Sequence, residues 1–275
     1  MKRLATWLAI HATGTAFAQG ALEGLAARFA LLRGVGSGGE VESSGELAAL
    51  ALLRRRVTGS CTVFDAGANV GDYAEAVLGR CRDLACRVHC FEPGAAAYRH
   101  LCSRHGGKES VVLNKIALGR EAGEATLWYD REGSGSASLT KRDLAHFGID
   151  FGMSETVAMT TIDHYCSLHA VPRIDLLKLD VEGHELDVLA GAETMFQRRA
   201  IDMVMFEFGG CNIDTRTFVR DFWQFFSARE MQLYRITPSG YLHRIDRYQE
   251  SLEQFRTTNF LAVGRHGGLA GAPVG

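Results

Sequence analysis

The sequence lacks an excess of charge of either sign. Its 275 residues carry 30 Lys and Arg against 32 Asp and Glu, which gives a net charge of −2 with His neutral. Domains that bind nucleic acid usually present a strongly basic surface, and the one basic run, Arg54–Arg56, is short. We therefore expect no nucleic-acid partner.

Cysteine patterns typical of metal sites and disulfide frameworks are also missing. The seven cysteines are odd in number and contain no C-x-x-C pair, so neither a disulfide framework nor a structural zinc site is indicated. Cys61, Cys86 and Cys90 stand beside apolar residues of expected strands, and we expect them to be buried thiols. Such thiols suit a reducing compartment, so we expect a cytoplasmic protein.

No apolar run is long enough to span a membrane, so we expect no transmembrane segment. Residues 1–32 are rich in Ala and place Leu22, Leu25, Phe29 and Leu32 at helical spacing. The basic start and Ala16–Ala18 imitate a signal peptide, but His11 interrupts the apolar run. We expect residues 1–45 to form an N-terminal extension, with a helix that packs on the domain or on a partner, followed by a glycine-rich linker.

The common glycine motifs for phosphate are absent as well. Between Thr62 and Tyr73 the chain reads TVFDAGANVGDY, which matches neither G-x-G-x-x-G nor the P-loop. An apolar run that ends at an acid and is followed by glycines predicts a strand, a tight turn and a helix. This is the first unit of a doubly wound α/β sheet, in which ligands bind at the carboxyl ends of the strands.

A second apolar strand, in RVHCFEPGAAAY, ends at Glu92. An acid at the end of the second strand is placed to bind a ribose diol, whereas Asp65 at the end of the first suits an amino group. The glycine turn and the two acids together describe a nucleoside that carries an amino acid. That ligand is S-adenosylmethionine (SAM).

A third stretch, Ile174 to Phe196, predicts a buried strand that ends at Asp180, then an acidic turn and a helix. With this stretch, the segments VFDAGANVGDY, FEPGAAAY, NKIALG and KLDVEGHELDVLAG resemble the FkbM-type family of SAM-dependent methyltransferases over about residues 57–264. The resemblance implies a Rossmann-like class I methyltransferase fold, an α/β fold with a mostly parallel seven-stranded sheet and a C-terminal antiparallel hairpin. It also implies transfer of the SAM methyl group, usually to oxygen.

We expect the methyltransferase domain to cover residues 46–264, with a lid-like insertion at residues 120–170. The insertion contains strand-like runs at Ala125–Tyr129 and Glu155–Met159, a glycine- and serine-rich loop at Gly133–Leu139, and a polar helical piece near Lys141–Phe147. A plain linker is the alternative, but long loops in compact domains often cover active sites. Residues 265–275 have little to bury and are expected to form a flexible tail.

The motif positions give a set of candidate cofactor-binding residues. Two of them, Ile116 and Ala117 in the NKIALG segment, rest on the resemblance alone. The candidates are Asp65, Gly67, Ala68, Asn69, Gly71, Tyr73, Glu92, Pro93, Ile116, Ala117 and Asp180.

The catalytic candidates are Asp180, Glu182, His184 and Glu207, which follow the fourth and fifth expected strands. His184 is the first choice for a general base because imidazole titrates near physiological pH; Asp180 is the alternative, or it orients the acceptor. Asp180, Glu182 and Glu207 could instead bind Mg²⁺ or Mn²⁺, although their spacing matches no metal motif.

The sequence thus predicts an enzyme that uses SAM to methylate a hydroxyl on a small-molecule or glycan acceptor: a sugar, glycolipid, polysaccharide or secondary metabolite. Two alternatives stay open. One is a nucleic-acid methyltransferase, although the chain contains no N-P-P-[YFW] motif and no Pro-Cys pair. The other is a non-catalytic or carrier-docked interaction protein that keeps the fold.

Overall fold

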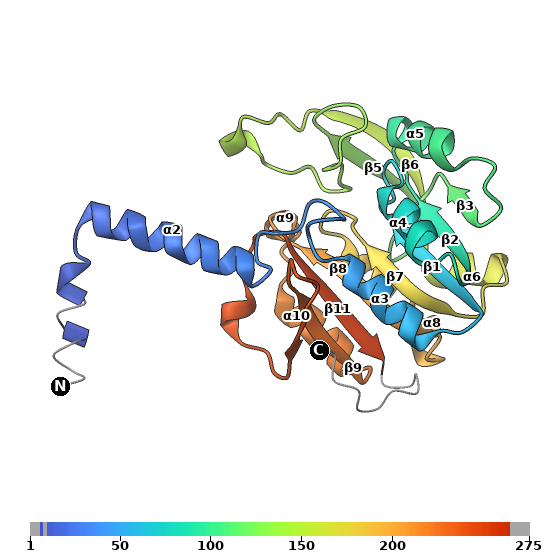
Figure 1. Cartoon of the computed structure of the whole chain (residues 1–275). Coiled ribbons are helices and arrows are strands. Elements are labelled where there is room, and N and C mark those ends of the chain that lie inside the picture. The colour runs from blue at the N-terminus through green and yellow to red at the C-terminus, as the bar shows by residue number, and fades with distance from the viewer. Residues whose placement is uncertain (1–5, 8–9, 265–275) are drawn as a thin grey trace.

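The computed structural model of the chain describes residues 6–7 and 10–264. It contains an eight-stranded sheet with helices on both faces and a separate three-stranded sheet (Figure 1). The expected flexible tail, residues 265–275, lies outside the described residues, as does part of the expected N-terminal extension.

The main sheet has the strand order β10-β9-β11-β8-β7-β1-β2-β3. From β3 to β8 neighbouring strands are parallel, and β11 runs antiparallel to both β8 and β9. The sheet therefore has the expected Rossmann-like arrangement and C-terminal antiparallel pairing, but it has eight strands where we expected seven, because β10 extends the edge beyond β9. The strands are β1 Ser60–Ala66, β2 Ala85–Phe91, β3 Val111–Asn114, β7 Ile174–Leu179, β8 Ile201–Phe208, β9 Met231–Ile236, β10 Leu242–Ile245 and β11 Thr258–Gly264.

Two layers of helices cover the main sheet. Buried residues of α3, α4 and α5 pack on one face, and those of α6, α7, α8 and α10 pack on the other. The helices are α3 Leu47–Arg56, α4 Asp72–Arg80, α5 Ala95–His105, α6 Ile162–Leu168, α7 Glu185–Ala190, α8 Glu193–Gln197, α9 Cys211–Thr215 and α10 Val219–Ser227, with a short 3-10 helix, η2, at Glu250–Leu252.

The alternation of side chains along β7 sets the position of the later site residues. Leu177 and Leu179 face the core under α6 and α7, whereas Leu176 faces the core under α3 and α4. Because successive side chains of a strand point to opposite faces, Lys178 shares the α3 and α4 side with Leu176.

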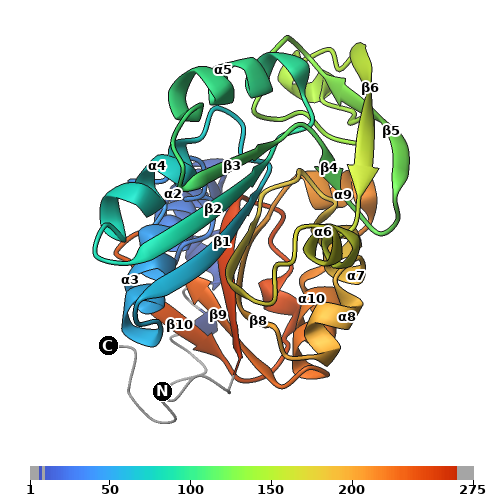
Figure 2. The ribbon, with the colours of Figure 1, turned by 90° about the vertical axis from the view of Figure 1, so that its right-hand side faces the viewer.

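The insertion supplies two of the three strands of the smaller sheet, which lies beside α5 at one end of the molecule (Figure 2). The strands of this sheet are β4 Ala117–Leu118, β5 Gly123–Tyr129 and β6 Met153–Thr160, so both expected strand-like runs are confirmed. The expected helical piece is only a short 3-10 helix, η1, at Ala145–Phe147. The prediction of a longer helix there was wrong because the segment contributes just one residue, Leu144, to the buried hydrophobic set.

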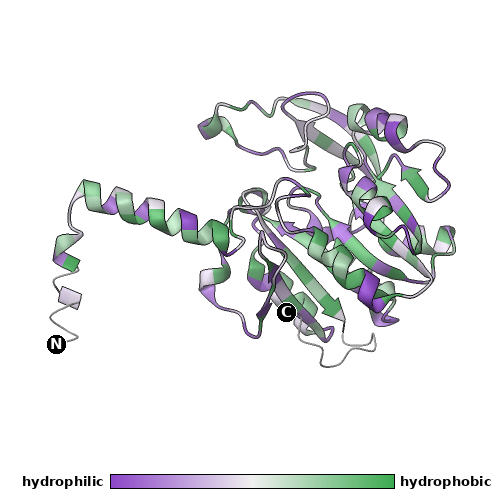
Figure 3. Cartoon of the chain, viewed as in Figure 1, coloured by the Kyte–Doolittle hydropathy of each residue, from purple (hydrophilic) through white to green (hydrophobic). Residues whose placement is uncertain are grey.

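The N-terminal helix, α2 Ala16–Leu32, projects from the rest of the molecule (Figure 1). Every residue of α2 is exposed or half-buried, including Phe17 and Phe29. Figure 3 shows that hydrophobic and hydrophilic residues alternate along this projecting helix. Of the two expected arrangements, packing of this helix on its own domain was therefore wrong, and packing on a partner stays a prediction. The chain is held where the helix ends, since the Arg235 guanidinium donates to the Arg33 carbonyl at 2.8 Å. Among the described residues, the structure contains no helix both long and apolar enough to cross a membrane.

The cysteine prediction was correct for Cys90, a buried free thiol, and wrong for Cys61 and Cys86. These two residues form a disulfide. They stand opposite each other in the parallel register of β1 and β2, with their Cα atoms 4.5 Å apart. The pairing depends on this register, which the 25-residue separation in the sequence does not reveal.

Candidate functional site

The glycine turn after β1 is held against the end of β7. Gly67 has φ +80°, and a Cβ at this position would lie 1.8 Å from the Asp180 carbonyl oxygen. Only glycine combines this left-handed backbone with so close an approach. The turn continues to Gly71, the N-cap of α4, which also has a positive φ. The tight turn therefore brings the ends of β1 and β7 together.

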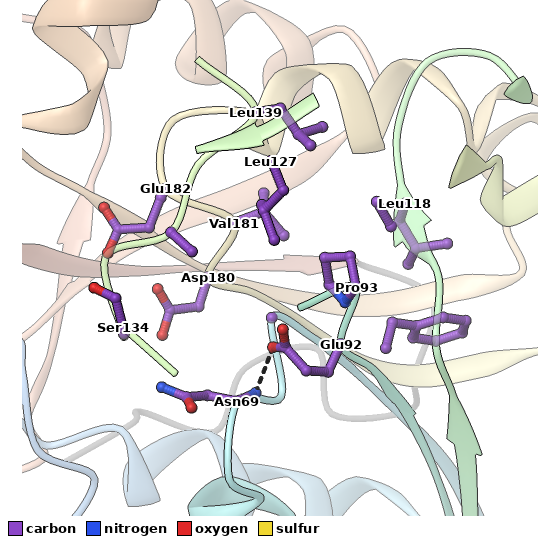
Figure 4. Close-up of a pocket in the computed structure, with 15 residues that line it drawn as sticks. Asn69, Glu92, Pro93, Leu118, Leu127, Ser134, Leu139, Asp180, Val181 and Glu182 are labelled. Atoms are coloured by element: carbon purple, nitrogen blue, oxygen red, sulfur yellow. Dashed lines mark hydrogen bonds between the residues drawn. The ribbon is translucent and has the colours of Figure 1, made fainter. Parts of the chain in front are cut away.

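Glu92, which follows β2, is fixed by two backbone amides. Its carboxylate accepts hydrogen bonds from Asn69 N at 2.9 Å and from Gly94 N at 2.8 Å. Burial raises the pKa of Glu92 to about 7, against the lowering effect of these two amides. The carboxylate thus ties the glycine turn to the start of α5 and faces a pocket between them (Figure 4).

This pocket lies at the carboxyl ends of β1, β2 and β7 and is partly open to solvent. Figure 4 shows polar side chains of Asn69, Ser134, Asp180 and Glu182 on one side and Pro93 and Leu118 on the other. The lining residues are Gly67, Asn69, Phe91, Glu92, Pro93, Ala117, Leu118, Leu127, Ser134, Gly135, Ala137, Leu139, Asp180, Val181 and Glu182.

The insertion contributes Leu127, Ser134, Gly135, Ala137 and Leu139 to this lining. Part of its glycine- and serine-rich loop therefore belongs to the pocket wall. Gly135 lies close to Asn69, since a Cβ on Gly135 would stand 3.2 Å from the side-chain nitrogen Nδ2 of Asn69.

Three side chains of the insertion hold it to the loop after β7. The Ser138 hydroxyl donates to the Glu182 carbonyl at 2.8 Å, and Thr140 Oγ1 lies 3.0 Å from His184 Nε2. The Arg142 guanidinium donates to Glu182 at 2.7 Å and to Asp214 on α9 at 3.1 Å. Arg142 is mostly buried, with 11% of its side chain exposed, so it lies between two acids with little water.

A second set of charges lies below the pocket. Lys178 Nζ donates to Asp180 at 2.9 Å and lies 3.9 Å from Asp65. Asp65 is fully buried, and neither of its carboxylate oxygens has a hydrogen-bond partner in the part of the chain that the structure describes. Burial raises the pKa of Asp65 to about 6, although Lys178 lowers it.

The loop after β7 concentrates acids whose pKa values are raised. Burial raises the pKa of Glu182 to about 8, helped by Asp180 and opposed by Arg142. Burial also raises the pKa of Glu185 to about 7, while backbone amides that donate to it lower the value. Burial and then the charges of Asp180 and Glu182 hold the pKa of half-buried Glu207 well above its ordinary value.

His184 is engaged at both ring nitrogens. Nδ1 lies 2.9 Å from Asp187, and Nε2 lies 3.0 Å from the Thr140 hydroxyl. The residue is the N-cap of α7 and connects this helix to the insertion. These two contacts favour a structural role for His184 rather than a catalytic one. Asp180, by contrast, is half-buried and lines the pocket.

Of the predicted cofactor residues, the structure brings Gly67, Asn69, Glu92, Pro93, Ala117 and Asp180 together around the pocket. The other predicted cofactor residues do not line it: Asp65, Ala68, Gly71, Tyr73 and Ile116. Ala68 and Tyr73 are buried in the core under α3 and α4, and Ile116 packs against the opposite core.

The possible metal ligands Asp180, Glu182 and Glu207 do not form a metal site. Within residues 6–7 and 10–264, no group of three or more His, Cys, Asp or Glu side chains is arranged to hold a metal ion. Two of these acids already pair with cations of the protein: Asp180 accepts a hydrogen bond from Lys178, and Glu182 accepts one from Arg142.

Sequence reasoning missed Lys178 and Arg142. Lys178 lies inside the motif KLDVEG, and a charged residue in an otherwise apolar strand was a signal that could have identified it. Arg142 carried no local signal because its acid partners stand 40 and 72 positions further along the chain.

The pocket lining contains groups of the kinds that SAM would need. Phe91, Pro93, Leu118 and Leu127 are apolar residues that would pack on an adenine ring. Glu92 would accept hydrogen bonds from a ribose diol, and Asp180 lines the same space. The side-chain oxygen of Asn69 is buried without a partner among the described residues, which leaves it able to accept a hydrogen bond from a ligand.

Comparisons with known proteins give a consistent result. The profile of the methyltransferase FkbM domain matches residues 65–236. A relative, the 2-O-methyltransferase NoeI of Sinorhizobium fredii (strain NBRC 101917 / NGR234), is 29% identical over 152 residues, which cover 50% of this chain and 60% of the relative.

Two solved structures are also similar. Methyltransferase FkbM from Methylobacillus flagellatus KT aligns with a TM-score of 0.46 and 14% identity, over 74% of this chain and 44% of that one. The O-methyltransferase from Bacillus cereus in complex with S-adenosylhomocysteine (SAH) aligns with a TM-score of 0.42 and 9% identity, over 82% of each chain. The chain thus spans less than two thirds of the first relative and of the Methylobacillus structure.

The family profile covers well over half of the chain, and it includes the glycine turn, Glu92 and the loop after β7 that form the pocket. This protein belongs to the FkbM family of SAM-dependent methyltransferases.

Proposed function

We propose that this protein transfers the methyl group of SAM to a hydroxyl on a sugar, glycolipid, polysaccharide or secondary metabolite. The observation that supports this most directly is the shared lining of one pocket. Glu92, suited to the cofactor ribose, and Asp180 and Glu182, suited to an acceptor hydroxyl, all face the same space. The relative NoeI, a 2-O-methyltransferase, supports oxygen as the methylated atom.

Methyl transfer needs the acceptor oxygen close to the methyl group and in line with the bond that breaks. An alcohol also has to lose its proton, so a base within reach increases the rate. Asp180 takes this role in our proposal because its carboxylate lines the pocket, whereas both ring nitrogens of His184 are already engaged. Glu182 and Glu207 lie at the same edge, and their raised pKa values favour the protonated, neutral form of both side chains.

The insertion, residues 120–170, is the part that we propose selects the acceptor. It roofs the pocket through Ser134–Leu139 and is held by Arg142 to two acids of the domain. We keep a small-molecule or glycan acceptor and exclude nucleic acid from the proposal, since the chain has no basic excess. The cytoplasmic location stays a prediction, and the Cys61–Cys86 disulfide bears against a reducing compartment.

The test is methyl transfer from labelled SAM to a panel of methyl glycosides, glycolipid extracts, polysaccharides and a control RNA. We expect label on a hydroxyl-bearing acceptor, with Asp180→Asn weakening SAM binding and also slowing turnover when SAM is saturating. Label on RNA alone would favour the nucleic-acid alternative. SAM binding without transfer to any acceptor class would favour the non-catalytic alternative.

A further inference from the structure

Lys178 is a lysine inside the sheet, with 6% of its surface exposed. All six residues of β7 are buried, and the other five include four aliphatic side chains. A lysine is almost never this buried unless its charge is paired. The position of Lys178 therefore needs an explanation in terms of the groups around it.

The groups that face Lys178 come from four elements. Asp180 accepts a hydrogen bond from Nζ at 2.9 Å, Asp65 on β1 lies 3.9 Å away, and the ring of Tyr73 on α4 lies 5.4 Å from Nζ. Glu46, just before α3, adds a further negative charge nearby. Burial lowers the pKa of Lys178, but Asp180, Asp65 and Glu46 together raise it above its usual value, so the lysine is charged.

The two carboxylates on Lys178 differ in what they face. Asp65 is fully buried, whereas Asp180 is 36% exposed at its side chain and lines the pocket. One lysine thus connects an acid that cannot reach a ligand to an acid that can. Three more acids stand around Asp180: Glu182, Glu185 and Glu207. The charge of Asp180 raises the pKa of each of these acids and so favours their neutral forms, whereas Lys178 holds Asp180 by a charged hydrogen bond.

We propose that Lys178 is a positioning residue for the proposed reaction: it holds the Asp180 carboxylate in place at the pocket wall, and buried Asp65 supplies the charge that keeps the lysine there. This inference rests on the proposed function, because it gives Asp180 a task in SAM binding and transfer. Lys178 itself acts only through Asp180, since it lies beneath the pocket lining.

The experiment separates the positioning role from simple charge balance. In Lys178→Met, two carboxylates are left close together, and the pair binds a proton more readily in the folded state. The melting temperature of the ligand-free variant should then fall more steeply than that of the wild type as the pH rises from about 5 to about 8. In the double variant Asp65→Asn/Lys178→Met one carboxylate is gone, and the steep pH dependence should disappear.

SAM affinity, measured by titration calorimetry, gives the second readout. The single variant Asp65→Asn and the double variant Asp65→Asn/Lys178→Met both lack the buried acid. They differ only in the hydrogen bond from Lys178 to Asp180, which the double variant has lost. We expect the double variant to melt at a temperature similar to that of Asp65→Asn but to bind SAM about tenfold more weakly, the effect of one charged hydrogen bond. Lys115→Met, which removes an exposed lysine, is the matched control and should change neither quantity.

Equal SAM affinity in Asp65→Asn and in the double variant would overturn the positioning role, and so would a Lys178→Met variant with the pH dependence of the wild type. Should Lys178→Met not fold, the comparison of Asp65→Asn with the double variant decides by itself. Absence of SAM binding by the wild-type protein would overturn the proposed function, and the positioning role with it.

Discussion

The two halves of the pocket edge hold their acids in different ways. At the end of β2, Glu92 is held by backbone amides of Asn69 and Gly94. At the end of β7, Asp180 and Glu182 are held by side-chain cations, Lys178 and Arg142. The first half therefore depends on the course of the backbone, and the second depends on buried ion pairs.

This difference has consequences for stability and for pH dependence. A carboxylate held by local amides can be lost without leaving another charge unpaired. A buried ion pair that loses one partner leaves an uncompensated charge, which is strongly destabilising. We therefore expect the β7 half to be the more sensitive to single substitutions, and the β1–β2 half to be the more robust.

The largest effect is expected for Arg142→Ala, which leaves Glu182 and Asp214 without their cation in a mostly buried position. We expect the free energy of unfolding to fall by about 3 kcal/mol, measured by urea denaturation. The matched control is Arg120→Ala, which breaks an exposed pair with Asp187 and should cost less than about 1 kcal/mol. Equal losses in the two variants would contradict the importance of the buried pair.

The next effect concerns the β1–β2 half, where the Cys61–Cys86 disulfide joins the two strands. The double variant Cys61→Ser/Cys86→Ser should lose about 3 kcal/mol or somewhat less, because the loop that the bond closes is short. Thiol titration of the denatured protein should count five free thiols before reduction and seven after it. Seven thiols before reduction would show that the bond does not form and would restore the expectation of buried thiols.

A smaller effect is expected for Glu185→Gln. Burial raises the pKa of Glu185 to about 7 from an ordinary value of 4.5. The folded state therefore favours the protonated form, and this contribution to stability is complete below pH 4.5 and is lost as the pH rises through 7. We expect Glu185→Gln to be more stable than the wild type by about 2 kcal/mol at pH 8, with a smaller difference at pH 4.5.

Thermal unfolding at the two pH values measures this difference. The exposed Glu124 provides the control substitution, Glu124→Gln, which should show no such pH dependence. A Glu185→Gln variant that is less stable than the wild type at pH 8 would contradict this account, because the amide can keep the oxygen that accepts from Val181 and Gly183.

The same contrast explains what could be predicted from the sequence. The glycine turn, Glu92 and Asp180 were predictable because each is part of a strand, turn and helix signal within a few residues. The mostly parallel sheet and its C-terminal antiparallel pairing followed from the resemblance to the family, but the eighth strand, β10, did not. The sequence could not predict the ion pairs of Arg142 with Glu182 and Asp214, or the Cys61–Cys86 disulfide. These contacts depend on how distant segments of the chain meet.

Asp65 shows the limit most clearly. Its position at the end of the first strand predicted direct contact with the cofactor, but its side chain points to Lys178 and is fully buried. The helix expected near the N-terminus is present as α2, but it does not pack on its own domain, because helical spacing of apolar residues predicts a helix without saying what the helix packs against.

The central claim is that the pocket beside Glu92 binds SAM, and titration calorimetry of SAM and SAH into the wild type, Glu92→Gln and Glu124→Gln tests it most directly. Glutamine keeps one acceptor for the amides of Asn69 and Gly94 but loses the negative charge that a ribose diol would donate to. We predict saturable binding by the wild type and by Glu124→Gln, and a loss of about tenfold to a hundredfold in affinity for Glu92→Gln. Equal affinity in the wild type and Glu92→Gln, or no binding by the wild type, would contradict the claim.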